Sequence, residues 1–131
     1  MGASVSLNKI SFQDMIYSIN NNYTIITVIK TDDCLIKGTV NIYNEEKIIN
    51  ELWDKKLLSN PIIIYGTNSS DENVIVKYKQ LHDLGFTHLY IYPGGLFEWL
   101  LLQDIYTDKN IKTTKKELNL MKYKPKNIIN L

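Results

Sequence analysis

The first regular pattern along the chain is a set of apolar residues at helical spacing. After Ser11, one face of a helix would carry Phe12, Met15, Ile16 and Ile19. Ser11 can serve as the N-cap, and Asp14 stands three residues later, where its carboxylate can complete a capping box. Three asparagines at 20–22 then interrupt the apolar pattern. We therefore expect a short first helix over residues 11–19.

Four short apolar runs have the composition of β-strands. Residues 23–29 are largely β-branched and show no strong polar alternation, which predicts a buried central strand. Residues 62–65 form the clearest strand, and residues 88–92 form another. Residues 35–42, around Gly38, predict a further short strand.

Helical patterns separate these runs. The first begins near residues 44–46 and ends before residues 59–61, with an apolar stripe of Ile48, Ile49, Leu52, Trp53 and Leu57. A second covers about residues 71–84, and Gly85 can form its C-terminal cap. A third, apolar and short, covers residues 96–103.

Strands that alternate with helices predict an α/β domain with a mostly parallel central sheet and helices on both faces. In such sheets ligands bind beyond the carboxyl ends of the strands. The clearest strand ends at Tyr65, and a polar loop follows it. This loop is where chemistry should be sought.

Four segments resemble motifs of the rhodanese-like domain family, and they occur along the chain in the same order as in the family. Residues 62–65 resemble the strand that delivers the family's active-site loop. Residues 84–89, LGFTHL, resemble its L-x-x-x-G-F-x-x-V passage, and residues 94–99, GGLFEW, resemble its closing G-G-x-x-x-W. Residues 34–42, CLIKGTVNI, resemble its H-I-P-G-A-x-N-I segment at Ile36, Gly38, Asn41 and Ile42.

The resemblance implies a rhodanese-like fold for residues 10–108. A flexible N-terminal segment, residues 1–9, would precede this domain. A C-terminal tail, residues 109–131, would follow it.

The active-site loop departs from the family at both of its ends. In the family it runs from a cysteine, whose thiolate accepts a sulfane sulfur or a phosphoryl group, to an arginine. Here glycine and aspartate occupy these ends, and the degenerate loop consists of Gly66, Thr67, Asn68, Ser69, Ser70 and Asp71. A glycine cannot replace the thiolate nucleophile. The resemblance therefore implies a pseudoenzyme, without catalytic residues.

The sequence also predicts what fills this loop. Asp71 and Glu72 make its mouth acidic, so thiosulfate and phosphate would be repelled. Ser69 and Glu72 have the spacing of a capping box, and Asp71 would lie favourably against the helix dipole. We expect protein groups to occupy the place of a substrate.

Two alternative functions remain open. One is an enzyme of the sulfurtransferase class with an unrecognised nucleophile, but a serine at 69 or 70 would need a base, and the histidines, His82 and His88, lie elsewhere in the sequence. Cys34 lies outside the loop and is expected to be a small buried hydrophobe. The other is a small-molecule sensor whose acidic loop would suit a neutral or cationic ligand. We expect no metal site and no cofactor.

The apolar helix at residues 96–103 has more hydrophobic surface than one side of a small domain covers. Three explanations are open: a protein-partner surface, a homodimer contact, or the tail folded back over the helix. The candidate partner surface consists of Leu96, Trp99 and Leu100.

Composition narrows the partners and the compartment. The chain is 44% hydrophobic and 22% charged with a net charge of +1, so it offers no overall basic field for nucleic acid. A single cysteine fits a reducing compartment. No apolar run near Met1 resembles a signal peptide, and none is long enough to span a bilayer. We expect a cytoplasmic protein.

The first six residues, MGASVS, fit the pattern for N-myristoylation of Gly2. This would place the protein at the cytosolic face of a membrane. One myristoyl chain holds a membrane only marginally, so a second signal is expected, and no polybasic cluster supplies it.

Overall fold

The computed structural model describes residues 6–31, 33–106 and 109–129, so Gly2 lies outside the described residues. Its elements, in chain order, are α1 (Phe12–Asn20), β1 (Thr24–Thr27), α2 (Glu45–Asp54), β2 (Ile62–Tyr65), α3 (Asn73–Asp83), β3 (Leu89–Tyr92), α4 (Gly95–Tyr106) and a 3-10 helix, η1 (Leu120–Tyr123).

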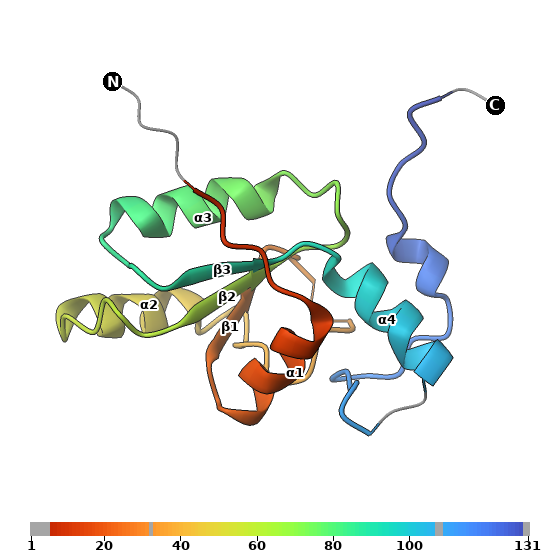
Figure 1. Ribbon diagram of the computed structural model, residues 1–131, viewed down its shortest axis with the longest axis horizontal. Helices are drawn as coiled ribbons and strands as arrows, with labels where there is room; N and C mark the ends of the chain where they lie inside the picture. The colour runs from red at the N-terminus through yellow and green to blue at the C-terminus, as the bar shows by residue number, and fades with distance from the viewer. Residues whose placement is uncertain (1–5, 32, 107–108, 130–131) are drawn as a thin grey trace.

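The sheet contains β1, β2 and β3 in that order, and both pairs of strands are parallel. Figure 1 shows these strands side by side, surrounded by the helices. Because side chains alternate along a strand, β2 supplies both faces of the sheet: Ile63 and Tyr65 face one core, and Ile62 and Ile64 face the other. Residues of α1 and α4 join the first core, and residues of α2 and α3 join the second. The predicted α/β fold with helices on both faces is confirmed.

The expected strand at 35–42 is wrong. This segment makes only two isolated bridges, Ile36 to Thr113 and Ile25 to Thr39. Gly38 between them has a φ of 94°, which turns the backbone out of an extended path.

The position of the first strand also differs from its prediction. β1 is an outer strand, and β2 is the central one. Residues 25–27 are nevertheless buried, because the chain beside Thr39 covers the outer edge of β1 and the amide of Val40 donates to the carbonyl of Ile25. An edge covered by a loop has the same apolar composition as a central strand.

Two predicted helix ends are confirmed. At the start of α1, Ser11 Oγ accepts from the amide of Asp14, and the Asp14 carboxylate accepts from the amide of Ser11, which completes the capping box. After α3, Gly85 has a φ of 104°, the left-handed conformation that glycine adopts at least cost.

The C-terminal tail packs on the body of the domain. Trp99 Nε1 donates to the carbonyl of Lys112 over 2.9 Å, and the amide of Thr114 donates to the carbonyl of Leu35 over 2.8 Å. Ile111 and Tyr123 are buried in the same core as α1 and α4.

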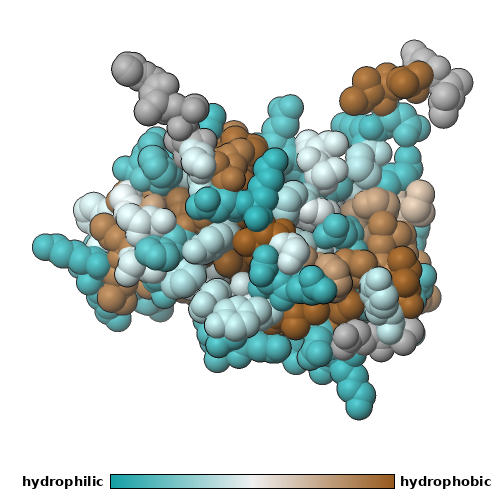
Figure 2. Space-filling model, viewed as in Figure 1, coloured by the Kyte–Doolittle hydropathy of each residue, from teal (hydrophilic) through white to brown (hydrophobic). Residues whose placement is uncertain are grey.

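The expectation of a partner surface at Leu96, Trp99 and Leu100 therefore needs correction. These side chains are 0%, 0% and 2% exposed, because the core and the tail cover them. The exposed hydrophobic residues of α4 are Ile105 and Tyr106 instead. Figure 2 shows hydrophobic surface in this region, where α4 and the tail meet.

Candidate functional site

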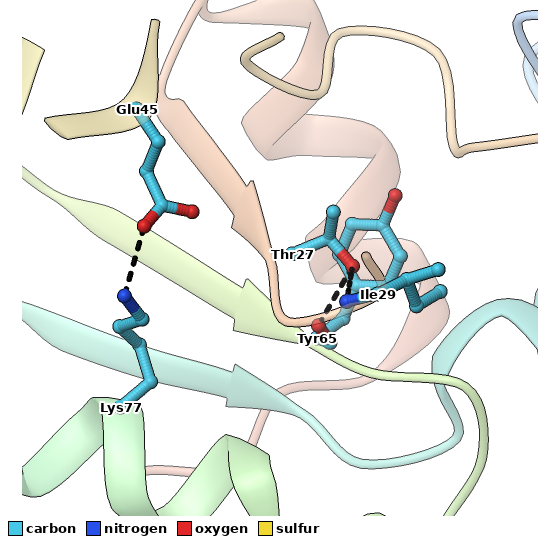
Figure 3. A network of polar contacts seen from close by, with 5 residues as sticks. All are labelled: Thr27, Ile29, Glu45, Tyr65 and Lys77. Atoms are coloured by element: carbon cyan, nitrogen blue, oxygen red, sulfur yellow. Dashed lines mark hydrogen bonds and ion pairs between the residues drawn. The ribbon is translucent and has the colours of Figure 1, made fainter. Parts of the chain in front are cut away.

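The loop of residues 66–71 follows β2 at the carboxyl edge of the sheet, and Tyr65 fixes its starting point. The carbonyl of Tyr65 accepts from Thr27 Oγ1, which itself accepts from the amide of Ile29 (Figure 3). The Tyr65 hydroxyl accepts from the amide of Ile36 over 3.1 Å and lies 2.7 Å from Thr39 Oγ1. Burial raises the pKa of Tyr65 to about 12. The residue before Gly66 is thus held at both its backbone and its ring.

The first turn of α4 fixes the next part of the loop. The amide of Leu96 donates to the carbonyl of Gly66, and the amide of Phe97 donates to that of Thr67, over 3.0 and 2.9 Å. Gly95 allows this approach, since a Cβ there would lie 2.5 Å from the carbonyl oxygen of Gly66. Gly95 also has a φ of 64°. A larger residue at 95 would push α4 away from the loop.

The side chain of Asp71 occupies the interior of the loop. Its Oδ2 accepts from the amide of Thr67 over 3.0 Å, and its Oδ1 accepts from the amide of Asn73 over 3.2 Å. A Cβ built at Gly66 would lie 2.5 Å from Asp71 Oδ2 and 2.7 Å from Val74 Cγ2. The space in which a side chain at residue 66 would begin is therefore filled by this carboxylate and by a methyl group of α3.

The predicted capping box of Ser69 and Glu72 is wrong. α3 begins at Asn73 with Glu72 as its N-cap, and Glu72 makes no capping hydrogen bond with its side chain. Asp71 provides an acceptor near the helix start, and Asn68 Oδ1 accepts from the amide of Ser70. The Asp71 carboxylate, one position before Glu72, accepts a backbone hydrogen bond at the helix start because the shorter aspartate side chain points into the turn.

A known family matches this arrangement. The sequence model described as the rhodanese-like domain matches residues 12–102. The chain belongs to the rhodanese-like domain family. The predicted resemblance and the fold that it implied are confirmed.

Solved rhodanese-like structures are similar to this domain. The Alr3790 protein from Anabaena sp. is 21% identical with a TM-score of 0.55, covering 71% of this chain and 86% of its own. At that identity the likeness concerns the fold. A separate crystal structure of the rhodanese-like domain of the same protein is 25% identical with a TM-score of 0.47, covering 61% of this chain and 92% of its own. No curated protein matches the sequence.

The thiol of Cys34, one of the alternative nucleophiles, lies outside the loop. Cys34 is 2% exposed, its Sγ contacts the carbonyl of Lys115 at 3.3 Å, and burial raises the pKa of its thiol, which favours the unreactive protonated form. The predicted buried position of Cys34 is confirmed.

Neither histidine is placed to activate a loop serine. His88 precedes β3, at the amino edge of the parallel sheet, whereas the loop that contains Ser69 follows the carboxyl edge. His82 lies in the last turn of α3, while Ser69 precedes the first turn of this helix. In the described residues, no three His, Cys, Asp or Glu side chains gather as a metal site.

The tail forms the far wall of a cleft beside the loop. Asn68 Nδ2 donates to the carbonyl of Tyr123 over 2.9 Å and joins the two segments. The cleft measures about 730 Å³, and its tail side carries Lys122, Lys124 and Lys126.

These lysines change the predicted electrostatics of the loop mouth. Asp71 and Glu72 line the same cleft, so the mouth is not acidic alone. These lysines occur at every second residue, a spacing that predicts one basic face on an extended segment. The spacing does not predict that this face lies opposite the loop.

Proposed function

We propose that this chain is a non-catalytic rhodanese-like module with a binding or scaffolding role. The observation that carries the proposal is the position of the Asp71 carboxylate, which fills the space at Gly66. Sulfur and phosphoryl transfer in this family's loop require a thiolate at residue 66, and glycine supplies none.

The hydrogen bonds of the loop support the same conclusion. An anionic substrate in such a loop is held by free backbone amides. Here the amides of Thr67 and Asn73 already donate to Asp71. An incoming anion would have to displace a carboxylate that is covalently part of the loop and that has its own negative charge.

Turnover assays test this proposal directly. We expect neither sulfur transfer from thiosulfate to cyanide nor hydrolysis of an aryl phosphate above the rate without protein. The Cys34→Ser variant serves as a matched control for the buried thiol. Turnover that survives Cys34→Ser would establish an enzyme with an unrecognised nucleophile and overturn the proposal.

We further propose that the module is held at the cytosolic face of a membrane through myristoylated Gly2. The sequence MGASVS supports this anchor. Among residues 6–31, 33–106 and 109–129, no helix is long and apolar enough to cross a membrane. Intact mass after production with N-myristoyltransferase tests the anchor, and Gly2→Ala is its control. An unmodified wild-type mass would remove this part of the proposal.

A further inference from the structure

The charges of the chain are divided unequally between body and tail. Residues 109–131 contain seven lysines and one acidic residue, Glu117. The preceding 108 residues contain the other eight lysines and thirteen acidic residues. The net charge of +1 therefore conceals a basic tail on an acidic body.

The end of the tail combines this charge with exposed apolar side chains. We define the C-terminal basic strip as Lys122, Lys124, Lys126, Ile128 and Ile129. All five residues are exposed, and Ile128 and Ile129 reach 95% and 76%. Figure 2 shows hydrophobic surface near the end of the C-terminal tail, above hydrophilic surface.

The two ends of this strip are held differently: Lys122 pairs with Glu117 at 3.6 Å, and the amide of Lys124 donates to the carbonyl of Met121, whereas the last residues are free to meet a surface. Residues 125–129 make no hydrogen bond to any other described residue. Figure 1 shows the segment extending away from the body beyond η1.

We propose that the C-terminal basic strip binds an anionic lipid membrane. Lysines are attracted by the negative potential of such a surface, and exposed isoleucines gain by entering the boundary between headgroups and acyl chains. A membrane satisfies both kinds of side chain at once.

Nucleic acid fits the strip less well. Its phosphates would attract the lysines but would leave Ile128 and Ile129 in water. Single-stranded nucleic acids also need exposed rings for stacking. The aromatic residue nearest the strip, Tyr123, is buried, and the chain contains no arginine.

The position of the strip relative to the N-terminal end adds support. Tyr78 of α3 donates from its hydroxyl to the carbonyl of Ser6 over 2.9 Å and fixes where this end leaves the body. In Figure 1 the red N-terminal segment and the blue C-terminal segment both extend toward the top of the view. This step rests on the proposed anchor at Gly2. The sequence predicts no polybasic cluster, because the lysines of the strip are not contiguous, but the strip can supply the second membrane contact that one myristoyl chain requires.

The test uses full-length protein carrying Gly2→Ala, so that no acyl chain contributes. Flotation is measured with vesicles of phosphatidylcholine alone and with vesicles that contain phosphatidylserine. We expect binding only to the anionic vesicles, weakened by salt. Replacing Lys122, Lys124 and Lys126 with Gln should weaken it by about 100-fold, since each lysine near an anionic surface contributes about one factor of five.

A matched variant controls for the loss of three charges. Lys47, Lys55 and Lys56 are exposed lysines in and just after α2, and replacing them with Gln should leave vesicle binding within about twofold of the parent. Replacing Ile128 and Ile129 with Ser should weaken the binding that persists at high salt.

Three results would overturn the inference. They are no binding to anionic vesicles, equal loss in both lysine variants, and preferential binding of polyuridylic acid over vesicles. Binding of the Gly2→Ala protein together with an unmodified Gly2 in the wild type would remove the anchor and leave the strip. Sulfurtransferase turnover would overturn the non-catalytic proposal without affecting either result.

Discussion

The Asp71 carboxylate lies where the side chain of residue 66 would begin: a Cβ built on Gly66 would be 2.5 Å from its Oδ2. A carboxylate at this distance must move before any larger residue can enter. The loop therefore has a glycine at residue 66 and no free space beside it for a larger side chain. We therefore expect that a thiol introduced at residue 66 alone would not create a reactive site.

Gly66→Cys should consequently destabilise the protein and remain inactive. The new side chain collides with Asp71 and with Val74, and insertion into a filled site costs about 1–3 kcal/mol. Urea unfolding measures this cost, and the thiosulfate assay measures activity. The exposed position Ser70 provides a control, because Ser70→Cys adds a thiol without this collision. Full stability of Gly66→Cys would contradict the packing of the loop.

Asp71→Ala should loosen the loop and reduce the cost of Gly66→Cys. It leaves the amides of Thr67 and Asn73 without their acceptor, at about 1–2 kcal/mol. Hydrogen exchange at Thr67 should accelerate relative to wild type. In a double-mutant cycle the two changes should couple favourably, since the smaller side chain makes room for the cysteine. Additive costs would show that Asp71 does not fill the site.

Tyr65→Phe should destabilise the protein by about 1–3 kcal/mol near neutral pH, because the buried amide of Ile36 loses its acceptor. Urea unfolding measures the difference from wild type. Tyr43→Phe, at a side chain that is 80% exposed, is the control and should be neutral.

The effect of Tyr65 should also depend on pH. Its pKa rises from 10.0 in the unfolded chain to about 12 in the fold, so the unfolded chain loses its proton first. The tyrosine's contribution is complete below pH 10 and falls as pH rises to about 12. The loss approaches about 2–3 kcal/mol, at about 1.4 kcal/mol per pH unit. The difference in the free energy of unfolding between wild type and Tyr65→Phe should therefore narrow between pH 10 and about pH 12. A constant difference would argue against burial of the hydroxyl.

Two substitutions in the tail should have very different effects on the free energy of unfolding. Ile111 is 2% exposed, so Ile111→Ala should lower the free energy of unfolding by about 2–5 kcal/mol. Leu118 is 83% exposed, and Leu118→Ala should change it by less than about 0.5 kcal/mol. Thermal unfolding of the two full-length variants and the wild type measures both changes in the free energy of unfolding. Equal, small effects would mean that the tail is not part of the core.

The sequence was most informative where a local pattern determines structure. The buried β2, the capping box of α1 and the glycine after α3 each follow from neighbouring residues. The prediction of a strand at residues 35–42 failed because the backbone turns at Gly38, so the segment forms isolated bridges and no continuous strand. Ile36 instead donates to a side chain, the hydroxyl of Tyr65, which is 29 residues away.

For the candidate site, the sequence gives the identities of the loop residues but not the arrangement of their side chains. Gly66 and Asp71 could be found by comparison with the family's loop. The inward direction of the Asp71 side chain depends on the backbone amides that donate to it. The spacing of residues in the sequence does not reveal these contacts. The lysines opposite the loop depend on the path of the tail, which is set by contacts such as Asn68 to Tyr123.

The contact between Trp99 and the tail also affects the choice of fragment for expression when the fragment is based on the residues that match the family. The family match ends at residue 102, yet the indole of Trp99 donates its hydrogen bond to Lys112. A fragment that stops at the match would display a tryptophan and neighbouring leucines to solvent, and it would tend to aggregate during purification. The smallest piece worth expressing extends at least through Tyr123.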